Sequence, residues 1–193
     1  MSNSIHKHFK FHKPYGMLCQ FSSNNTKELR KKVFLPQLEV FPEGLMPVGR
    51  LDEKSEGLIL LTTDGKLSDR INRSGIEKEY YAQLDGEISD DAITKLITGV
   101  SIGFEGKKYT TKPCLVKRIE TPLLDKPNPK IRLGRHRPNS WVSITLTEGK
   151  FRQVRKMTAA VGYPTLRLVR VRIDSIFLYD LKPTEAIALS SLL

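Results

Sequence analysis

The spacing of apolar and polar residues along the chain predicts several short strands. A run of four apolar residues, Leu58–Leu61, is followed by the turn sequence Thr62–Gly65 and indicates a strand buried on both faces. Strict alternation in Trp141–Thr147 is typical of a strand with one buried face. Weaker alternation predicts further strands at 78–85, at 109–119, at 165–173, and as a pair within 9–21 around Pro14-Tyr15-Gly16.

Helices are predicted where apolar residues recur at three- and four-residue intervals. One such segment runs from a capping Asp64 through Asn72, and another begins at Ser89. A third has an apolar stripe from Phe151 to Val161, and a short helix is expected near 27–34. By contrast, residues 121–139 contain four prolines and no sustained apolar period, which predicts a long exposed loop. The mixture of strands and helices favours the α+β class.

The strand predicted at 165–173 has an irregular pattern. Its apolar residues alternate up to Leu168 and resume at Val169, a slip of one position that a β-bulge would produce. With such a bulge, Arg167, Arg170 and Arg172 would share the opposite face.

Positive charge is concentrated in the second half of the chain. The 193 residues include 32 Lys and Arg against 21 Asp and Glu, a net charge of +11. Residues 107–172 hold 17 of these cations and three acids, so this segment carries +14 and the remainder −3. The loop 121–139 alone supplies Lys126, Lys130, Arg132, Arg135 and Arg137. Because phosphate neutralisation releases counterions, so uneven a charge predicts a nucleic-acid partner.

Other features exclude several classes of protein. Cys19 and Cys114 lie far apart, without a CxxC pair or a cysteine–histidine pair at ligand spacing, so neither a disulfide framework nor a zinc site is expected. No apolar run approaches the roughly 20 residues that span a bilayer, and the N-terminus lacks the apolar core of a signal peptide. We expect a cytoplasmic protein. The histidines that could suggest a metal are His6, His8, His12 and His136. The first three lie at an N-terminus expected to be loose, with no carboxylate or cysteine nearby, so a metal site is not expected.

An aspartate ahead of the buried strand is the first candidate for chemistry. Asp52 ends the sequence Gly49-Arg50-Leu51-Asp52, where a scaffold strand can hold it while the loop stays accessible. By position alone a solvated turn aspartate would be the favoured interpretation, because loop acids are usually solvated. Asp52 and Glu56 could also form a glycosidase pair, but that interpretation leaves the +14 segment unexplained and offers a single tryptophan for sugar stacking.

Longer stretches make the pattern specific. GRLDEKSEGLILLTTDG (49–65), KEY (78–80) and EGKFRQVRKM (148–157) resemble, in this order, the RsuA-like family of RNA pseudouridine synthases. HKPYGMLCQF (12–21) resembles the family's first strand and PTLRLVRVRI (164–173) a late strand, so the resemblance covers nearly the whole chain. The chain is similar to the shorter members, in which no S4-type RNA-binding module precedes the catalytic part.

The resemblance implies a pseudouridine synthase fold: a long mixed, mainly antiparallel sheet in two lobes, with a central basic catalytic cleft. We expect a loose N-terminus at 1–8, a catalytic domain at 9–185 with a lobe boundary near 72–77, and a C-terminal tail at 186–193. No metal or organic cofactor is expected, and neither is a membrane. The expected state is a monomer.

The resemblance also implies roles for individual residues. Asp52 matches the catalytic aspartate, Arg50 the residue that assists base flipping, Tyr80 the aromatic that stacks on the target base, and Arg155 the arginine that pairs with the aspartate. Isomerising uridine breaks the N1–C1′ bond and joins C5 to C1′, and extruding the base costs a few kcal/mol that inserted side chains can offset. The further residues expected to bind RNA are Lys78, Lys130, Arg132, Arg135, Arg137, Arg152, Lys156, Arg167 and Arg170.

Each assignment has a structural alternative. Tyr80 could serve strand packing alone, and Arg152, Arg155 and Lys156 could form a solvated helix face or contact phosphates. The expected substrate is a uridine in large-subunit ribosomal RNA, with small-subunit RNA or tRNA as alternatives. A non-catalytic RNA-binding or ribosome-assembly protein would need the basic segment but would have no use for Asp52, Tyr80 and Arg155 together.

The basic loop yields a prediction that salt titration can check. Replacing Lys130, Arg132, Arg135 and Arg137 by alanine should reduce the slope of log K against log salt by about 0.7 per lost phosphate contact on single-stranded RNA. Stability should change by only about a few tenths of a kcal/mol per residue, because such charges are solvated. An unchanged slope would place the loop outside the interface and favour Arg167, Arg170 and Arg172 instead.

Overall fold

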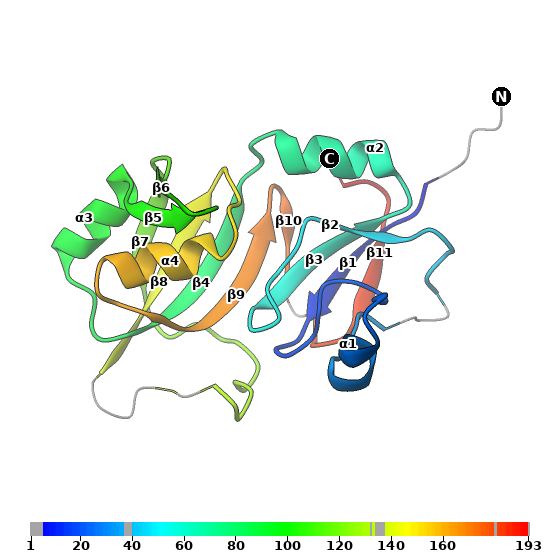
Figure 1. The fold of residues 1–193 in the computed structure, drawn as a ribbon, viewed down its shortest axis with the longest axis horizontal. Coiled ribbons are helices and arrows are strands. Elements are labelled where there is room, and N and C mark those ends of the chain that lie inside the picture. The colour runs from blue at the N-terminus through cyan, green and yellow to red at the C-terminus, as the bar shows by residue number, and fades with distance from the viewer. Residues whose placement is uncertain (1–5, 37–39, 132, 134–137, 180, 193) are drawn as a thin grey trace. The chain divides into compact units, whose positions relative to one another are not determined.

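The computed structural model describes residues 6–36, 40–131, 133, 138–179 and 181–192. These residues form two compact units (Figure 1). The first unit comprises Met1–Ile76 and Val171–Leu193, and the second comprises Glu77–Arg170. The chain therefore passes between units twice, and the second passage lies within a strand. The class is α+β, as predicted.

The first unit is built around antiparallel strands. Strand β1 pairs on one side with β3 and on the other with β11, while β2 also pairs with β3. All seven residues of β3 are buried, which confirms the strand predicted from the apolar run. The elements of the first unit are β1 (His8–Lys13), α1 (Thr26–Lys31), β2 (Met46–Val48), β3 (Glu56–Thr62), α2 (Gly65–Arg73), the end of β9 (Thr165–Ile173), β10 (Ile176–Phe177) and β11 (Ala186–Leu189).

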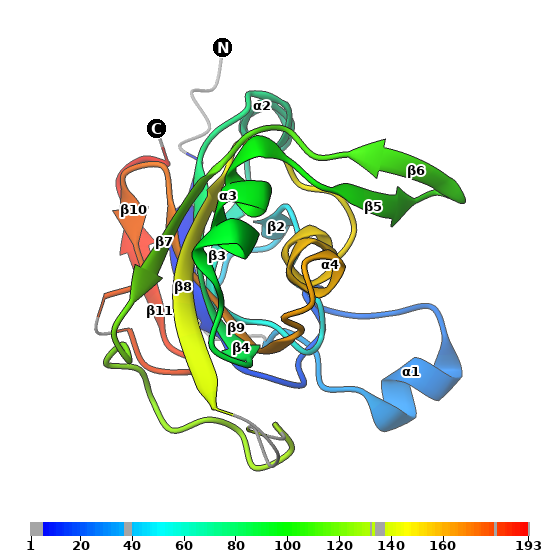
Figure 2. The same cartoon turned by 90° about the vertical axis from the view of Figure 1, so that its left-hand side faces the viewer.

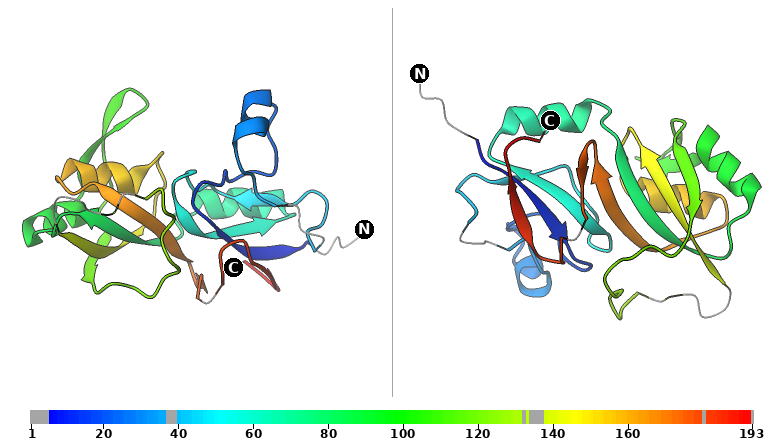
Figure 3. Two further views of the ribbon diagram at one scale, coloured as in Figure 1. Left: turned by 90° about the horizontal axis from the view of Figure 1, so that it is seen from below. Right: turned by 180° about the vertical axis from the view of Figure 1, so that it is seen from behind.

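The second unit has a sheet in which β8 lies between β4 and β7, with antiparallel pairing on both sides. Helices α3 and α4 lie on the same side of these strands (Figure 2). Strands β5 and β6 form a separate hairpin that projects from the rest of the unit (Figure 3). The elements of the second unit are β4 (Lys78–Asp85), α3 (Asp90–Thr98), β5 (Ser101–Phe104), β6 (Lys107–Thr110), β7 (Leu115–Ile119), β8 (Asn139–Leu146), α4 (Gln153–Ala160) and the start of β9.

Helix starts follow the capping residues in the sequence. The Asp64 side chain accepts hydrogen bonds from the backbone N–H groups of Lys66 and Leu67, and the Ser89 hydroxyl accepts one from Ala92. These bonds satisfy amides that a helix leaves without an intrahelical partner. The predicted starts of α2 and α3 are thereby confirmed.

Two strand predictions fail for identifiable reasons. Residues 17–21 form no second strand of a local hairpin, because β1 pairs instead with the distant β3 and β11, and Met17 makes only an isolated bridge to Val33. The strand predicted at 109–119 is interrupted between β6 and β7. Pro113 has no N–H to donate, and the Cys114 amide donates to Ile97 at the end of α3.

Other differences concern the end of the chain. Residues 186–189 belong to the predicted C-terminal tail, but they form β11 and pair with β1. In β9, residues 167–170 are all buried, so the two faces of this strand do not divide into an apolar and an exposed basic side. A strand covered on both faces loses the period of two on which the prediction rested.

Gly99 sets the junction between α3 and the β5–β6 hairpin. Its φ angle is +110°, and a Cβ atom at this position would lie 2.4 Å from the backbone oxygen of Thr111. Thr111 in turn donates its amide to Val100, and its hydroxyl accepts the Val100 amide. Any side chain at position 99 would therefore displace the base of the hairpin.

We expect Gly99→Ala to lower the free energy of unfolding by about 2 kcal/mol or more, from backbone strain together with the clash at Thr111. Gly103→Ala in the same hairpin is the matched control, because a Cβ there meets no atom within 4 Å. Its effect should stay within about 0.5 kcal/mol. Urea denaturation of both variants measures the difference, and equal stabilities would contradict the assigned junction.

Candidate active site

Asp52 lies in the loop that connects β2 to β3 in the first unit. Its backbone carbonyl accepts a hydrogen bond from the Ser55 amide at 3.0 Å, which closes a turn. Leu51 is buried, Asp52 is half-buried and Arg50 is exposed. The buried leucine anchors the loop from inside, so that its two charged neighbours reach the surface.

Lys13 is a polar residue that helps to hold this loop, and the sequence analysis did not single it out. Its side chain is fully buried, and its ammonium donates to the carbonyls of Met17 at 2.7 Å, Pro14 at 3.0 Å and Glu53 at 3.4 Å. The Glu53 carbonyl also accepts the Gly16 amide at 2.8 Å. The residue after Asp52 is thus tied to the turn that follows β1.

Gly49 permits the backbone path that leads into the loop. Its φ angle is +68°, and a Cβ atom there would lie 2.9 Å from the Asn72 side-chain oxygen on α2. Only glycine adopts such a conformation without strain. The first residue of the Gly-Arg-Leu-Asp sequence is therefore required by the chain's conformation.

Tyr80 and Lys78 lie on β4 in the second unit, opposite Ile144 and Leu146 of β8. Tyr80 is 9% exposed, so most of its ring packs in the sheet. Burial, and secondly the charge of Arg170, lower the pKa of Lys78. Both residues belong to a largely buried part of the unit.

Arg155 projects from α4, and its guanidinium donates to the Thr165 carbonyl of β9 at 3.1 Å. A second contact, between the hydroxyls of Thr158 and Thr165 at 2.7 Å, joins the same two elements. The position of Arg155 therefore depends on the packing of α4 against β9.

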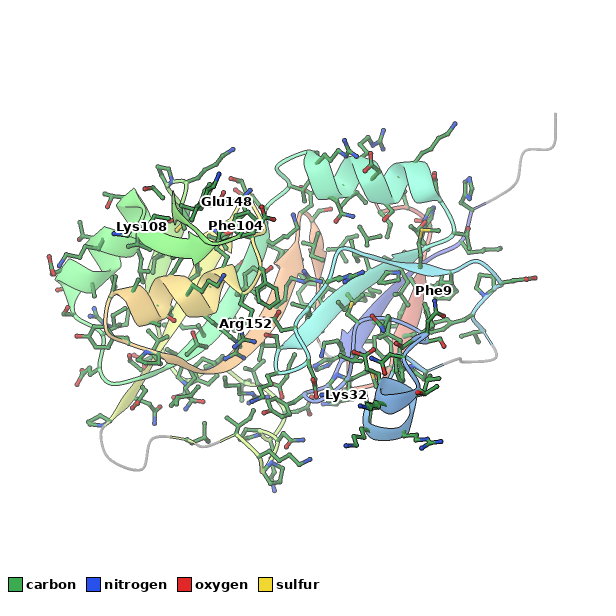
Figure 4. All side chains as sticks on the ribbon, in the orientation of Figure 1. Phe9, Lys32, Phe104, Lys108, Glu148 and Arg152 are labelled. Carbon is green, nitrogen blue, oxygen red and sulfur yellow. The ribbon has the colours of Figure 1, made fainter. Side chains whose placement is uncertain are left out.

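A carboxylate that sequence reasoning missed organises the approach to α4. Glu148 accepts hydrogen bonds from the Tyr109 hydroxyl, from the Lys112 amide at 2.9 Å and from the Gln153 side chain at 2.6 Å. Figure 4 labels Glu148, Phe104 and Arg152 in this region. We call Glu148, Tyr109 and Gln153 the Glu148 clamp. It ties the β5–β6 hairpin to the start of α4.

The clamp shifts the protonation of its members. Burial by itself would raise the pKa of Glu148, but the hydrogen bonds from Tyr109, Lys112 and Gln153, with the charge of Lys150, lower it overall. The pKa of Tyr109 is raised, first because its hydroxyl donates to Glu148. In the sequence, the clamp is marked only by Glu148-Gly149 ahead of a predicted helix. This pair of residues does not reveal which groups donate hydrogen bonds to Glu148.

The other residues expected to bind RNA differ in exposure. Arg152 precedes α4 with a left-handed backbone, φ +52°, and Lys156 donates to the Gly103 carbonyl at 2.6 Å; both are half-buried. Lys130 is exposed. Arg167 and Arg170 are only 7% and 2% exposed. Arg132, Arg135 and Arg137 lie outside the described residues.

The predicted residues are divided between the two units: Asp52 and Arg50 belong to the first, Tyr80 and Arg155 to the second. Within the residues that the structure describes, no three His, Cys, Asp or Glu side chains form a group suited to a metal ion. His12, for example, has its ring nitrogen Nδ1 2.6 Å from the Leu181 carbonyl. None of the helices in the described ranges has the length and apolarity to cross a membrane.

Solved structures of related enzymes share this fold. A crystal structure of a pseudouridylate synthase superimposes with a TM-score of 0.72 at 28% sequence identity, covering 95% of this chain and 70% of that one. The predicted pseudouridine synthase fold is confirmed by this match.

Sequence relatives of this chain are also named as pseudouridine synthases. Ribosomal large subunit pseudouridine synthase E of Xanthomonas campestris is 41% identical over 176 residues, covering 90% of both chains. The protein of the same name from Vibrio parahaemolyticus is 38% identical over 177 residues, covering 91% of this chain and 70% of the relative. Ribosomal large subunit pseudouridine synthase B of Escherichia coli K12 is 34% identical over 170 residues, covering 86% of this chain and 50% of the relative.

The family model described as RNA pseudouridylate synthase matches residues 7–160, a range that includes Asp52, Tyr80 and Arg155. Together with the extended identity to synthase E, this match confirms the resemblance found in the sequence motifs. This chain belongs to the RNA pseudouridylate synthase family.

Proposed function

We propose that this chain isomerises a specific uridine of large-subunit ribosomal RNA to pseudouridine. The observation that carries the proposal is the 41% identity, over 90% of both chains, to a relative named for this activity. The concentration of positive charge in residues 107–172 supports RNA as the substrate, because a polyanion is attracted to such a field. The expected setting is the cytoplasm, and the expected state is a monomer.

Asp52 is the proposed catalytic residue. The reaction breaks the N1–C1′ bond, forms a C5–C1′ bond, removes the proton from C5 and adds one at N1. A carboxylate can assist either by attacking C1′ or by taking the 2′ proton. The loop geometry supports the role, since Asp52 is half-buried on a turn held by the buried Lys13.

Three further roles are proposed from the family resemblance. Arg50, exposed in the same loop, would assist extrusion of the uridine, and Tyr80 would stack on its base. Arg155 would pair with the catalytic carboxylate, because a neighbouring cation keeps a carboxylate ionised and a guanidinium can bind both oxygens.

The remaining cations are proposed to bind the RNA backbone. Exposed or half-buried residues suit direct phosphate contact, and they are Lys78, Lys130, Arg152 and Lys156. Arg132, Arg135 and Arg137 stay in this set on sequence grounds. Arg167 and Arg170 are buried, so their proposed contribution is the electrostatic field of the unit more than a direct contact.

Asp52→Asn should abolish isomerisation while RNA affinity stays within a few-fold of wild type, because the amide removes the nucleophile and base but leaves the phosphate-binding cations. Release of tritium from RNA carrying [5-³H]uridine measures the loss of the C5 proton under single-turnover conditions. Asp69→Asn, at an exposed ion pair with Arg73 on α2, is the matched control and should retain full activity.

A near-normal single-turnover rate for Asp52→Asn would overturn the assignment of this residue. To identify the substrate, pseudouridines should be mapped in ribosomal RNA from cells with and without the protein. A single uridine that is modified only when the protein is present is the expected result. An unchanged map of large-subunit RNA would contradict the proposed substrate.

A further inference from the structure

Phe151 is an exposed aromatic residue within a basic stretch of the second unit. It lies in the connection between β8 and α4, and 67% of its surface is accessible. Single exposed apolar residues are common and need no explanation by themselves. Phe151 differs because cations surround it: Lys150 and Arg152 are its chain neighbours, and the Lys156 ammonium lies 5.3 Å from its ring centroid.

The surroundings of Phe151 are held in place by contacts within the second unit. The Gln153 amide donates to the Lys150 carbonyl at 3.0 Å, and the Lys150 amide donates to the Gln153 side chain at 2.9 Å. Gln153 is also a member of the Glu148 clamp. The turn that carries Phe151 is thus fixed at both ends, which lowers the entropy cost of binding a ligand there.

The cations beside Phe151 are likewise ordered. Lys156 donates to the Gly103 carbonyl at 2.6 Å, and Gly103 pairs in the hairpin with the exposed Lys108. The Lys150 ammonium lies about 5 Å from two ring centroids, at 5.1 Å for Phe104 and 5.0 Å for Tyr109. We call Phe151, Lys150 and Lys156 the Phe151 platform.

The local charge favours an anionic ligand. Residues 149–160 contain four cations and no acid, and Glu148 is already engaged by the clamp donors. On the hairpin, Lys107 and Lys108 outnumber Glu105. An exposed aromatic ring among cations matches the two parts of an unpaired nucleotide, because the base offers a face for stacking and the phosphate a charge.

We propose that the Phe151 platform binds an unpaired nucleotide of the RNA substrate, with its base stacked on Phe151 and its phosphates beside Lys150 and Lys156. A base inside a continuous duplex has no free face, so the platform selects RNA with single-stranded or looped nucleotides. The inference rests on the proposed function for its choice of RNA. The inference adds to that function a second base contact, separate from the one proposed for Tyr80. It also adds a preference for RNA with unpaired nucleotides.

The test compares four proteins: wild type, Phe151→Ala, Phe151→Leu and Phe151→Trp. Binding is measured with a short labelled single-stranded RNA and with a fully paired duplex of the same sequence. Phe151→Ala and Phe151→Leu should weaken single-strand binding about tenfold, as expected for the loss of one base stack, and duplex binding less than about twofold. Phe151→Trp should bind at least as well as wild type.

Two further readouts separate stacking from other causes. The slope of log K against log salt should be the same for Phe151→Ala as for wild type, since no cation is removed. Leu115→Ala removes another exposed apolar side chain of the second unit, on β7, and should leave both affinities within about twofold. Melting temperatures should coincide, because Phe151 contributes little to the core.

Distinct results would overturn the inference. Wild-type affinity of Phe151→Ala for the single strand, or wild-type affinity of Phe151→Leu, would exclude a base stack while leaving the Asp52 chemistry untouched. Conversely, if the wild-type protein releases no tritium from RNA but the Phe151 variants still lose single-strand affinity, the stacking inference stands and the proposed isomerase function fails.

Discussion

A charged group that leaves water needs partners of opposite polarity, and in each unit such a group joins segments that lie near a proposed site residue. In the first unit it is the ammonium of Lys13, fully buried and bonded to three backbone carbonyls. In the second it is the half-buried carboxylate of Glu148, which accepts hydrogen bonds from three donors. Leaving the buried ammonium of Lys13 without partners would cost several kcal/mol, so the segments that supply them are held in place. Glu148 joins its segments in the same way, but at a smaller cost because water reaches it. Those segments adjoin the Asp52 loop in one unit and α4 in the other.

Much of the fold could be predicted because local signals and tertiary structure agree. The apolar run of β3, the alternation of β8 and the caps Asp64 and Ser89 each specify an element without knowledge of the rest. Prediction failed where pairing was long-range. Residues 17–21 alternate as a strand should, yet β1 pairs with β3 and β11, which both lie far from it in the sequence. The short strands β5 and β11 have too few residues to show a period.

The candidate site was predicted by a different kind of signal. Asp52 stood out by its place before a buried strand, and the roles of Tyr80 and Arg155 came from family resemblance. Lys13 and Glu148 could not be found this way, because the structural role of such a charge is recognised only by acceptors or donors that lie elsewhere in the chain. The same limit affects Arg167 and Arg170. An alternating pattern suggested an exposed basic face, whereas coverage of both faces of β9 buries them.

The Glu148 clamp has a consequence for the acid–base behaviour of the protein. A carboxylate whose folded pKa is lowered contributes stability above its unfolded pKa and loses that contribution as pH falls through the lowered value. A phenol whose folded pKa is raised contributes stability below its unfolded pKa and loses it as pH rises through the raised value. Between these limits, which enclose neutrality, neither partner changes its proton. Glu148 and Tyr109 therefore keep their protonation states across the physiological range, and so does the hydrogen bond with which they hold the Phe151 turn. A change in rate near pH 7 must originate in other groups.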